Sequence, residues 1–411
     1  MPKSGMTRRD ALALTAAGTL ASACGGPTAN GKTHVAVIGG GIIGAAIAYY
    51  LTQGGAQVTV LERNGLASRA SHGTFAWLNA SWAKQPRHYH RLNQLGLAGW
   101  KELVAEAGLP IKWAGSIEWF GSEERQQKLA RQIDEQVEWG EPARMIARDE
   151  LQSMEPGVAF GDLTSAAFSP NDGALDPVLA TQTLMDRAIA LGAKVETNCE
   201  AISQSRTANG TTILTTTNGE LECDTIVLAT GADPNATRKL AGIDIPQRTT
   251  PGVIAITKPM APMIDAIIVA PGVHIHQRGD GRVVLGEQGG APQNEAHAAR
   301  LADRPTSFPN ADFAGQHARR ILDVAVRYVP ALSTAEMEEV IIGWRPLPLD
   351  GHPVIGFSPE QPGAYLAITH SGVSLAPIVG KMTAQEILNG HTVAALDAYR
   401  PDRDFETIQR Y

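Results

Sequence analysis

Six residues near the start of the chain, Gly39-Gly40-Gly41-Ile42-Ile43-Gly44, have the spacing G-x-G-x-x-G. Gly39 would permit a tight turn, Gly41 would let the backbone approach a pyrophosphate, and Gly44 would let a helix pack closely on a strand. Glu62 follows about 20 residues later, where its carboxylate could accept hydrogen bonds from ribose hydroxyls. With an apolar strand before it and a helix after it, this constellation predicts a dinucleotide site.

Two later segments bear on the choice between FAD and NAD. Residues 226–232 form a predicted strand that runs into Thr230-Gly231, as in the second strand end of two-part FAD-binding folds. Residues 365–368 lead through 369–373 into a predicted helix. The N-terminus of that helix would face the flavin pyrimidine, where its partial positive charge stabilises the reduced ring. We therefore predict FAD, with an ordinary βα unit as the alternative interpretation.

The elements that must position these residues begin as a βαβ unit, with strands at 34–38 and 56–61 around a helix at 42–53. Strands near 225 and 364 belong with this unit, so the cofactor domain is predicted to be discontinuous. Further predicted helices cover 87–108, 122–140, 175–191, 311–328 and 375–388. We assign 33–84, 166–245 and 336–411 to an FAD-binding domain, and 85–165 and 246–335 to a substrate domain.

The first 24 residues resemble a twin-arginine (Tat) export signal. Lys3, Arg8 and Arg9 precede a short apolar stretch at 11–23, which ends in small residues. We expect a location in the periplasm, or on the outer face of the membrane as a lipoprotein. Lipidation of Cys24 stays open, because Leu20 lies four residues before it rather than three. A mistaken start site is the alternative interpretation of the arginine pair.

Composition excludes some classes of function. The net charge is −7, with 43% hydrophobic and 19% charged residues, which argues against a dedicated nucleic-acid binder. The spacing of Cys199 and Cys223 does not suggest a metal site, and we expect two buried free thiols rather than a disulfide. No internal apolar run approaches the roughly 20 residues needed to span a bilayer.

The chain resembles the D-amino acid oxidase, glycine oxidase and sarcosine oxidase superfamily. The matching segments are 39–44 with Glu62, 68–73, 173–177, 229–231, 281–286, 343–346, 350–356 and 370–377. The resemblance implies an α/β fold of the two-domain, glutathione-reductase-type Rossmann-like class with an α+β substrate domain of mixed sheet. The expected FAD contacts are Gly39, Gly41, Ile42, Ile43, Gly44, Glu62, Arg63, Ser68, Ser71, His72, Gly73, Thr230, Gly231, Gly372, Val373 and Ser374.

The resemblance also implies oxidation of the C–N bond of an amino acid or related amine, by hydride transfer to flavin N5. Arg345 matches the position of the carboxylate-binding arginine of glycine oxidases, and a planar guanidinium suits a carboxylate. His370 is the second candidate for the catalytic site. His72 is expected either to contact or covalently hold the flavin, or to be a packing histidine. His274 and His276 share one strand face and would touch substrate if that face lines the cavity.

Two departures from the family pattern concern the flavin and the electron acceptor. No cysteine lies at 344–346, which excludes the thioether link of covalent sarcosine oxidases. Val284 takes the position of a lysine that activates oxygen in those enzymes, so oxygen and a quinone or other carrier both remain open as acceptors. Oxidation of a 2-hydroxy acid or polyol phosphate, a non-catalytic flavin-binding accessory role and an NAD-dependent dehydrogenase remain as alternative functions.

Overall fold

The computed structural model describes residues 32–80, 84–248, 251–287 and 304–407. Residues Thr33–Tyr411 form one compact unit. The predicted export signal and Cys24 lie outside the described residues. Across the described ranges, no helix combines the length and the apolar character needed to cross a membrane.

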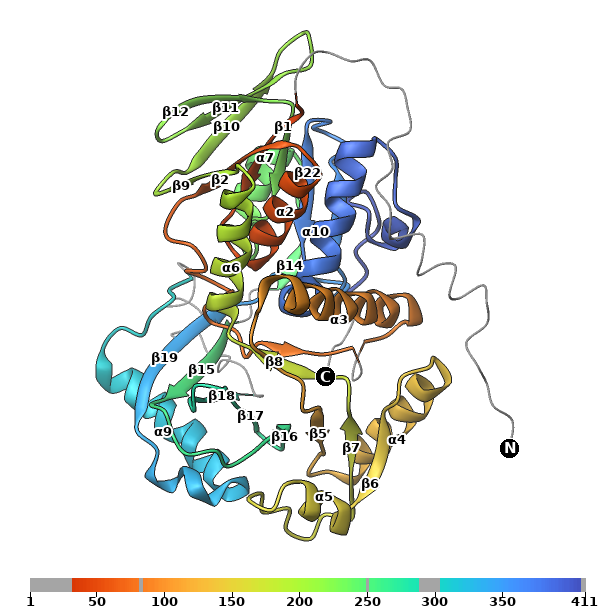
Figure 1. Ribbon diagram of the computed structural model, residues 1–411, viewed down its shortest axis with the longest axis vertical. Coiled ribbons are helices and arrows are strands. Elements are labelled where there is room, and N and C mark those ends of the chain that lie inside the picture. Colours follow the sequence, from red (N-terminus) through yellow and green to blue (C-terminus); the bar gives the residue numbers. More distant parts are fainter. Residues whose placement is uncertain (1–31, 81–83, 249–250, 288–303, 408–411) are drawn as a thin grey trace. The chain divides into compact units, whose positions relative to one another are not determined.

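A six-stranded sheet forms the centre of the half that carries the glycine motif (Figure 1). The strand order is β21-β22-β13-β1-β2-β9, and every pair is parallel except β21 with β22. The strands are β1 His34–Ile38, β2 Gln57–Glu62, β9 Lys194–Thr197, β13 Thr225–Leu228, β21 Val354–Phe357 and β22 Ala364–Ile368. The predicted link between the strands near 225 and 364 and the first βαβ unit is confirmed.

Both faces of this sheet are covered, so its strands are apolar throughout rather than alternating. Val35 and Val37 pack beneath helices α2 Ile42–Gln53, α6 Pro177–Ala190 and α10 Gly372–Asn389. Ala36 and Ile38 face the opposite layer. That layer is α7 Pro234–Ala241 with an antiparallel sheet of β10 Ala201–Arg206, β11 Thr212–Thr216 and β12 Gly219–Cys223.

Helices α2 and α10 cross so closely that only small residues fit at the contact. A Cβ on Gly380 would lie 2.8 Å from the backbone of Ala46. Most of α2 is buried, as expected for a helix that is apolar on all sides. This packing fixes the N-termini of both helices at the same edge of the sheet as the ends of β1 and β22.

An eight-stranded mixed sheet dominates the second half of the molecule, in the lower part of Figure 1. Its order is β19-β15-β18-β17-β16-β5-β7-β6, and β16 with β5 is a parallel pair. Helix α9 Ala311–Tyr328 packs on the face that carries Ile275 and Leu285. The strands are β5 Ser116–Glu118, β6 Arg144–Ala147, β7 Ser165–Ser169, β15 Pro251–Thr257, β16 Ile267–Ala270, β17 Val273–Gln277, β18 Val283–Glu287 and β19 Met337–Trp344.

The remaining helices divide between the two halves. Helix α3 Arg87–Ala107 packs its buried face on the same core as α10, whereas α4 Glu123–Glu138 and α5 Arg148–Met154 flank the large sheet. The short strands are β3 Trp77–Leu78, β4 Ile111–Lys112, β8 Gly173–Leu175, β14 Gln247–Arg248 and β20 Leu347–Pro348, and the 3-10 helices are Pro330–Thr334 and Ala394–Tyr399.

The domain boundaries stay a prediction, but three elements pack with a different half of the molecule from the one predicted for them. β7 and β19 belong to the large sheet, although the predicted substrate domain ends at 165 and at 335. α3 packs with the core formed by α2 and α10 rather than with the large sheet. Cys199 and Cys223 are buried free thiols, as predicted.

Candidate functional site

A cavity of about 790 Å³ runs from the carboxyl ends of β1, β2 and β13 to the inner face of the eight-stranded sheet. Both catalytic candidates line it, and so do the predicted FAD contacts except Gly44 and His72. Parallel strands end at one edge of their sheet, which is where α/β folds bind ligands. Residues from positions 38 to 374 therefore meet in one place.

The glycine motif forms a cradle with no room for side chains. Gly39 has φ of +115°, and a Cβ there would lie 2.4 Å from the carbonyl oxygen of Ala229. A Cβ on Gly44 would lie 1.9 Å from the carbonyl oxygen of Gly39, so this residue packs helix against strand and does not line the cavity. Gly41 lines the cavity, and a Cβ there would lie 3.1 Å from Ser71 Oγ.

Backbone amides hold Glu62 at the end of β2. Its Oε2 accepts from the Gly40 N–H at 2.7 Å, and its Oε1 accepts from the Asn64 N–H at 2.8 Å. A carboxylate oxygen accepts more than one hydrogen bond, so both atoms remain available to ribose hydroxyls. Ser71 Oγ accepts from the N–H of Ile42 at 2.9 Å and orders the first turn of α2.

Three arginines line the cavity near the end of β13. Arg63 pairs with Asp233 at 2.7 Å, and Arg304 donates to the carbonyl oxygen of Ala232. Burial lowers the pKa of Arg69, and the charges of Arg63 and Arg304 lower it further against the opposing effect of the nearby acids. Such crowding of positive charge is relieved by an anionic ligand, and a pyrophosphate is the anion that the glycine cradle would place nearby.

Two buried polar atoms in the cavity wall lack a partner within the described ranges. They are Oγ1 of Thr369, at the end of β22, and Oδ1 of Asn79. Buried polar groups are nearly always hydrogen-bonded, so these atoms indicate a ligand. Together with the cradle, Glu62 and the arginines, they fit FAD.

The sheet wall of the cavity carries Arg345, His274 and aromatic rings. Arg345 is half-buried, and within the described part of the chain it has no carboxylate or other hydrogen-bonding partner. Burial lowers the pKa of His274 to about 4, with a further contribution from the charge of Arg345, so the imidazole is neutral at pH 7. His274 meets Phe75 and Trp77 edge to face, at centroid distances of 5.4 and 5.9 Å.

His276, the second histidine of β17, does not line the cavity. Its Nε2 lies 2.9 Å from the carbonyl oxygen of Phe75 and donates to it. Burial lowers its pKa to about 3, so it too is neutral. His276 therefore holds the loop that carries Phe75, while His274 faces the cavity. Of the two histidines predicted to share one strand face, one lines the cavity, and its contact with substrate stays a prediction.

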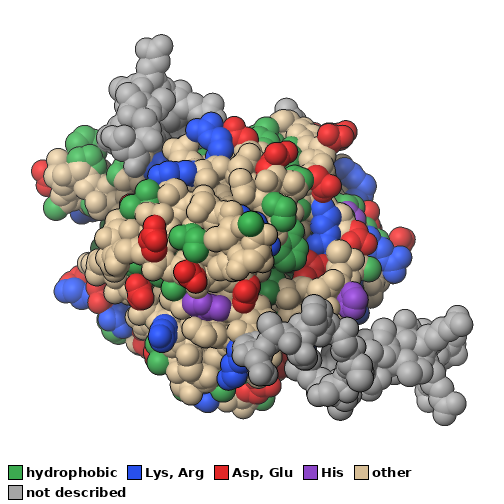
Figure 2. Space-filling model, turned by 90° about the horizontal axis from the view of Figure 1, so that it is seen from above, with side chains coloured by type: hydrophobic (Ala, Val, Ile, Leu, Met, Phe, Trp, Pro, Cys, Tyr) green, Lys and Arg blue, Asp and Glu red, His purple; other side chains and the backbone are tan. Residues whose placement is uncertain are grey.

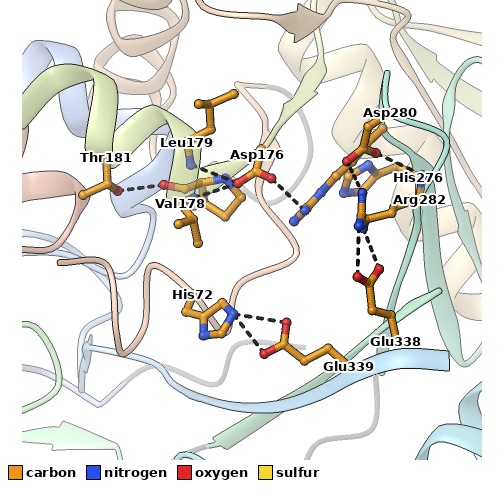
Figure 3. Close-up of polar contacts among 12 residues, drawn as sticks. His72, Asp176, Val178, Leu179, Thr181, His276, Asp280, Arg282, Glu338 and Glu339 are labelled. Carbon is orange, nitrogen blue, oxygen red and sulfur yellow. Dashed lines mark hydrogen bonds and ion pairs between the residues drawn. The ribbon is translucent and has the colours of Figure 1, made fainter. Parts of the chain in front are cut away.

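His72 does not line the cavity, although Ser71 and Gly73 on either side of it do. Its imidazole lies 3.2 Å from Glu339 on β19, and both side chains are partly exposed. Figure 3 shows the ring directed at that carboxylate. Residues 69–73 form a turn, with the amides of His72 and Gly73 bonded to the carbonyl oxygen of Arg69, so neighbouring side chains diverge. This position favours the alternative of a hydrogen-bonded packing histidine, and a flavin contact of His72 stays a prediction.

Sequence reasoning missed Lys84, which lines the cavity next to α10. Its Nζ donates to Ser371 Oγ at 2.9 Å, and the hydroxyl of Tyr89 lies 2.8 Å from the same oxygen. Ser371 and His370 precede the first turn of α10 and line the cavity. No local pattern could have identified Lys84, because 287 residues separate it from Ser371.

Two buried acids, Asp172 and Glu118, lie behind the sheet wall of the cavity, where Asp172 holds Trp77. Asp172 accepts from the indole N–H of Trp77 at 2.9 Å and from Ser116 Oγ at 2.7 Å. Burial raises the pKa of Glu118 well above its usual range, and the charge of Asp172 raises it further. No cluster of three or more His, Cys, Asp or Glu within the described residues could hold a metal ion.

The surface shows no single-sign stripe on the face seen in Figure 2, where acidic and basic side chains are mixed. The candidate binding site is therefore the cavity of about 790 Å³ rather than this outer face.

Comparison with known proteins gives consistent matches. A family model described as FAD-dependent oxidoreductase (DAO) matches residues 34–386. Glycine oxidase of Geobacillus kaustophilus is 26% identical over 363 residues, covering 86% of this chain and 92% of that protein. Glycine oxidase of Bacillus subtilis is 26% identical over 390 residues, covering 91% and 98%. The crystal structure of glycine oxidase from Geobacillus kaustophilus superposes with a TM-score of 0.78 at 25% identity, covering 91% of this chain and 100% of that one.

Proposed function

Since the chain belongs to the DAO family of FAD-dependent oxidoreductases, we propose that it oxidises the C–N bond of an amino acid or related amine that carries a carboxylate. The observation that carries the proposal is Arg345, a guanidinium on the cavity wall without a counter-ion among the described residues. The likeness to the glycine oxidases of Geobacillus kaustophilus and Bacillus subtilis supports the same substrate class.

FAD, when bound, supplies the acceptor for the hydride that leaves the carbon next to the amine. Arg345 would clamp the substrate carboxylate through two parallel N–H···O bonds and so fix the position of that carbon. His274 is neutral beside Arg345 and can accept a hydrogen bond from the amine. Phe75 and Trp77 would exclude water from this end of the cavity.

The experiment is an anaerobic titration of the purified flavoprotein with a panel of substrates. Glycine, N-methylglycine, D- and L-amino acids, simple amines and 2-hydroxy acids are added while the oxidised flavin absorbance is followed. Bleaching by an amino acid supports the proposal and names the class. Bleaching by 2-hydroxy acids alone would shift the assignment to C–O oxidation, and a flavin that no compound bleaches would favour a non-catalytic flavin-binding role.

Two variants test the clamp. Arg345→Lys keeps the charge but loses the bidentate geometry, so we expect KM for the carboxylate substrate to rise by about tenfold or more with FAD content unchanged, on the order of 1.5–3 kcal/mol for charge-assisted bonds. Arg238→Lys, at an exposed pair with Asp244, is the matched control. Equal kinetics in both variants would remove Arg345 from the substrate site.

The electron acceptor and the cellular location are further parts of the proposal. Letting air into the reduced protein distinguishes oxygen from a quinone or other carrier by the rate at which the absorbance returns. Export by the Tat route is tested by fractionating cells that produce the full chain and a variant with Arg8→Lys and Arg9→Lys. Loss of label from radioactive fatty acid in Cys24→Ser would establish the lipid anchor, and an unlabelled parent protein would exclude it.

A further inference from the structure

Ser371 does not act as a helix cap, although it occupies the N-cap position of α10. A serine there normally accepts a hydrogen bond from an amide of the first helical turn. In this structure its side chain makes no such bond, and its oxygen instead accepts from Lys84 Nζ at 2.9 Å. The first-turn amides of α10 thus have no side-chain cap and open toward the cavity that Gly372, Val373 and Ser374 line.

Lys84 adds a full positive charge to this helix end. Tyr89, fully buried in α3, holds Ser371 from the other side at 2.8 Å, and the ammonium of Lys84 lies 5.6 Å from the centre of the Tyr89 ring. Lys84 is the one lysine among the described residues that lines the cavity. The ammonium, the hydroxyl and the phenol form a connected group whose position is set by two helices.

A second observation marks the same place as a ligand site. Thr369 is 3% exposed and lines the cavity two residues before Ser371. Its hydroxyl has no hydrogen-bond partner within the described residues. An orphaned buried hydroxyl, uncapped amides and an ammonium therefore converge on one side of the cavity, and all of them favour a ligand that carries acceptor atoms and negative charge.

We propose that Lys84, held by Ser371, stabilises the negative charge that the flavin pyrimidine gains on reduction. The inference rests on the proposed function, because it takes the end of the cavity at α10 to be where the flavin ring lies. In the reaction, a hydride with its two electrons leaves the substrate carbon, whose C–H bond breaks. The substrate departs as an iminium ion, and the ring gains one hydrogen and one negative charge.

Binding of the substrate carboxylate is the competing role for Lys84, and the structure disfavours it. Arg345 lies on the sheet wall beside His274, whereas Lys84 is fixed at α10 by Ser371. The other cations of the lining, Arg63, Arg69 and Arg304, gather around Asp233 and Ala232 at the end of β13. Each group of cations thus faces a different part of the cavity.

The test measures the flavin without any substrate. Photoreduction against a reference dye gives the two-electron reduction potential of bound FAD, and titration with sulfite, which adds to flavin N5 and leaves a negative charge on the pyrimidine, gives a Kd. In Lys84→Met we expect the equilibrium between oxidised and reduced FAD to shift about tenfold toward the oxidised form, which lowers the reduction potential by about 30 mV. The sulfite Kd should rise about tenfold. Lys84→Arg should keep most of the parent value.

Lys101→Met is the matched control, since Lys101 lies over Trp113 outside the cavity. A potential and a sulfite Kd in Lys84→Met that equal those of this control would overturn the proposal, and a raised KM in that variant would then assign Lys84 to substrate binding. FAD content and melting temperature identify a variant that merely misfolds. If Lys84→Met misfolds, Ser371→Ala takes its place, because it removes the hydrogen bond that holds the ammonium. The reduction potential of Ser371→Ala must then shift in the same direction. A chain that no amine reduces but whose potential falls in Lys84→Met would refute the proposed substrate class alone.

Discussion

Gly343→Ala is expected to damage the site far more than the fold. Gly343 on β19 crosses Gly73 of the loop after β2, and a Cβ on Gly343 would lie 1.8 Å from the carbonyl oxygen of Gly73. Ordinary contact begins at 3.4 Å, so the two segments must separate by about 1.6 Å, which is 3.4 minus 1.8. The backbone at Gly343 is not left-handed, so alanine itself is not strained there.

The expected magnitudes follow from that displacement. Overpacking typically costs about 1–3 kcal/mol, partly offset by roughly 0.5–1 kcal/mol gained on replacing glycine within a strand. The free energy of unfolding should therefore fall by about 1–2 kcal/mol. Arg345 lies two residues beyond Gly343, and a misplacement of about 1 Å can reduce turnover roughly 100-fold. We expect kcat/KM to fall by that factor or more.

Steady-state kinetics, FAD content and urea denaturation distinguish these effects. The matched control is Gly279→Ala, at an exposed turn of the same sheet where a Cβ would meet nothing within 4 Å. The control should match the parent protein in all three measurements. Unchanged kcat/KM in Gly343→Ala would refute the argument that this backbone crossing sets the position of Arg345.

Two further predictions concern stability. Glu386 is 3% exposed and accepts two hydrogen bonds from Arg400, at 2.8 and 2.9 Å. Arg400→Ala would leave this buried carboxylate without its cation, so the free energy of unfolding should fall by about 3–5 kcal/mol. Urea denaturation measures the change, and Arg238→Ala is the surface control. Burial holds the pKa of His274 at about 4 and that of His276 at about 3, whereas the unfolded chain protonates both near 6.5. The unfolded state binds more protons below that value, so stability should decline as pH falls from about 6.5 toward 4, and His276→Gln should flatten the decline.

The cofactor end of the site could be predicted from sequence because its signals are local. The turn, the helix N-terminus and Glu62 lie within one βαβ unit, and each depends on residues a few positions away. The helix predicted at 42–53 has the observed bounds of α2. α10 begins at Gly372, three residues before its predicted start, because Gly372–Ser374 already have helical geometry.

Two short helices, α5 and α7, were not predicted. α7 opens with Asp233-Pro234, and the Asp233 side chain accepts from the N–H of Ala236. The same Asp-Pro start opens α6 at Asp176-Pro177, within the helix predicted over 175–191. The signal for α7 was therefore present, but eight residues give too little apolar periodicity to confirm it.

The substrate end could not be predicted, because its contacts join distant segments. Trp77 meets Asp172 and Gly73 meets Gly343 through the packing of the two halves. Which residue of the turn 71–73 faces inward is decided by that same packing, and Ser71 does so while His72 pairs with Glu339. Composition and spacing carry no information on such pairings until the topology is known.

The cations of the cavity explain how a chain of net charge −7 can attract anionic ligands. Three of the four acids that line the cavity are engaged, Glu62 by two amides, Asp233 by Arg63 and Glu287 by Arg320, and Glu200 is the fourth. Arg345 retains an unopposed charge among the described residues, and a low-dielectric wall concentrates its field. Burial is the larger cause of the lowered pKa of His274, and a carboxylate bound to Arg345 would offset the smaller contribution of the Arg345 charge. Substrate binding should therefore raise the proton affinity of His274, so its imidazole becomes a better acceptor for the amine at the moment the substrate arrives.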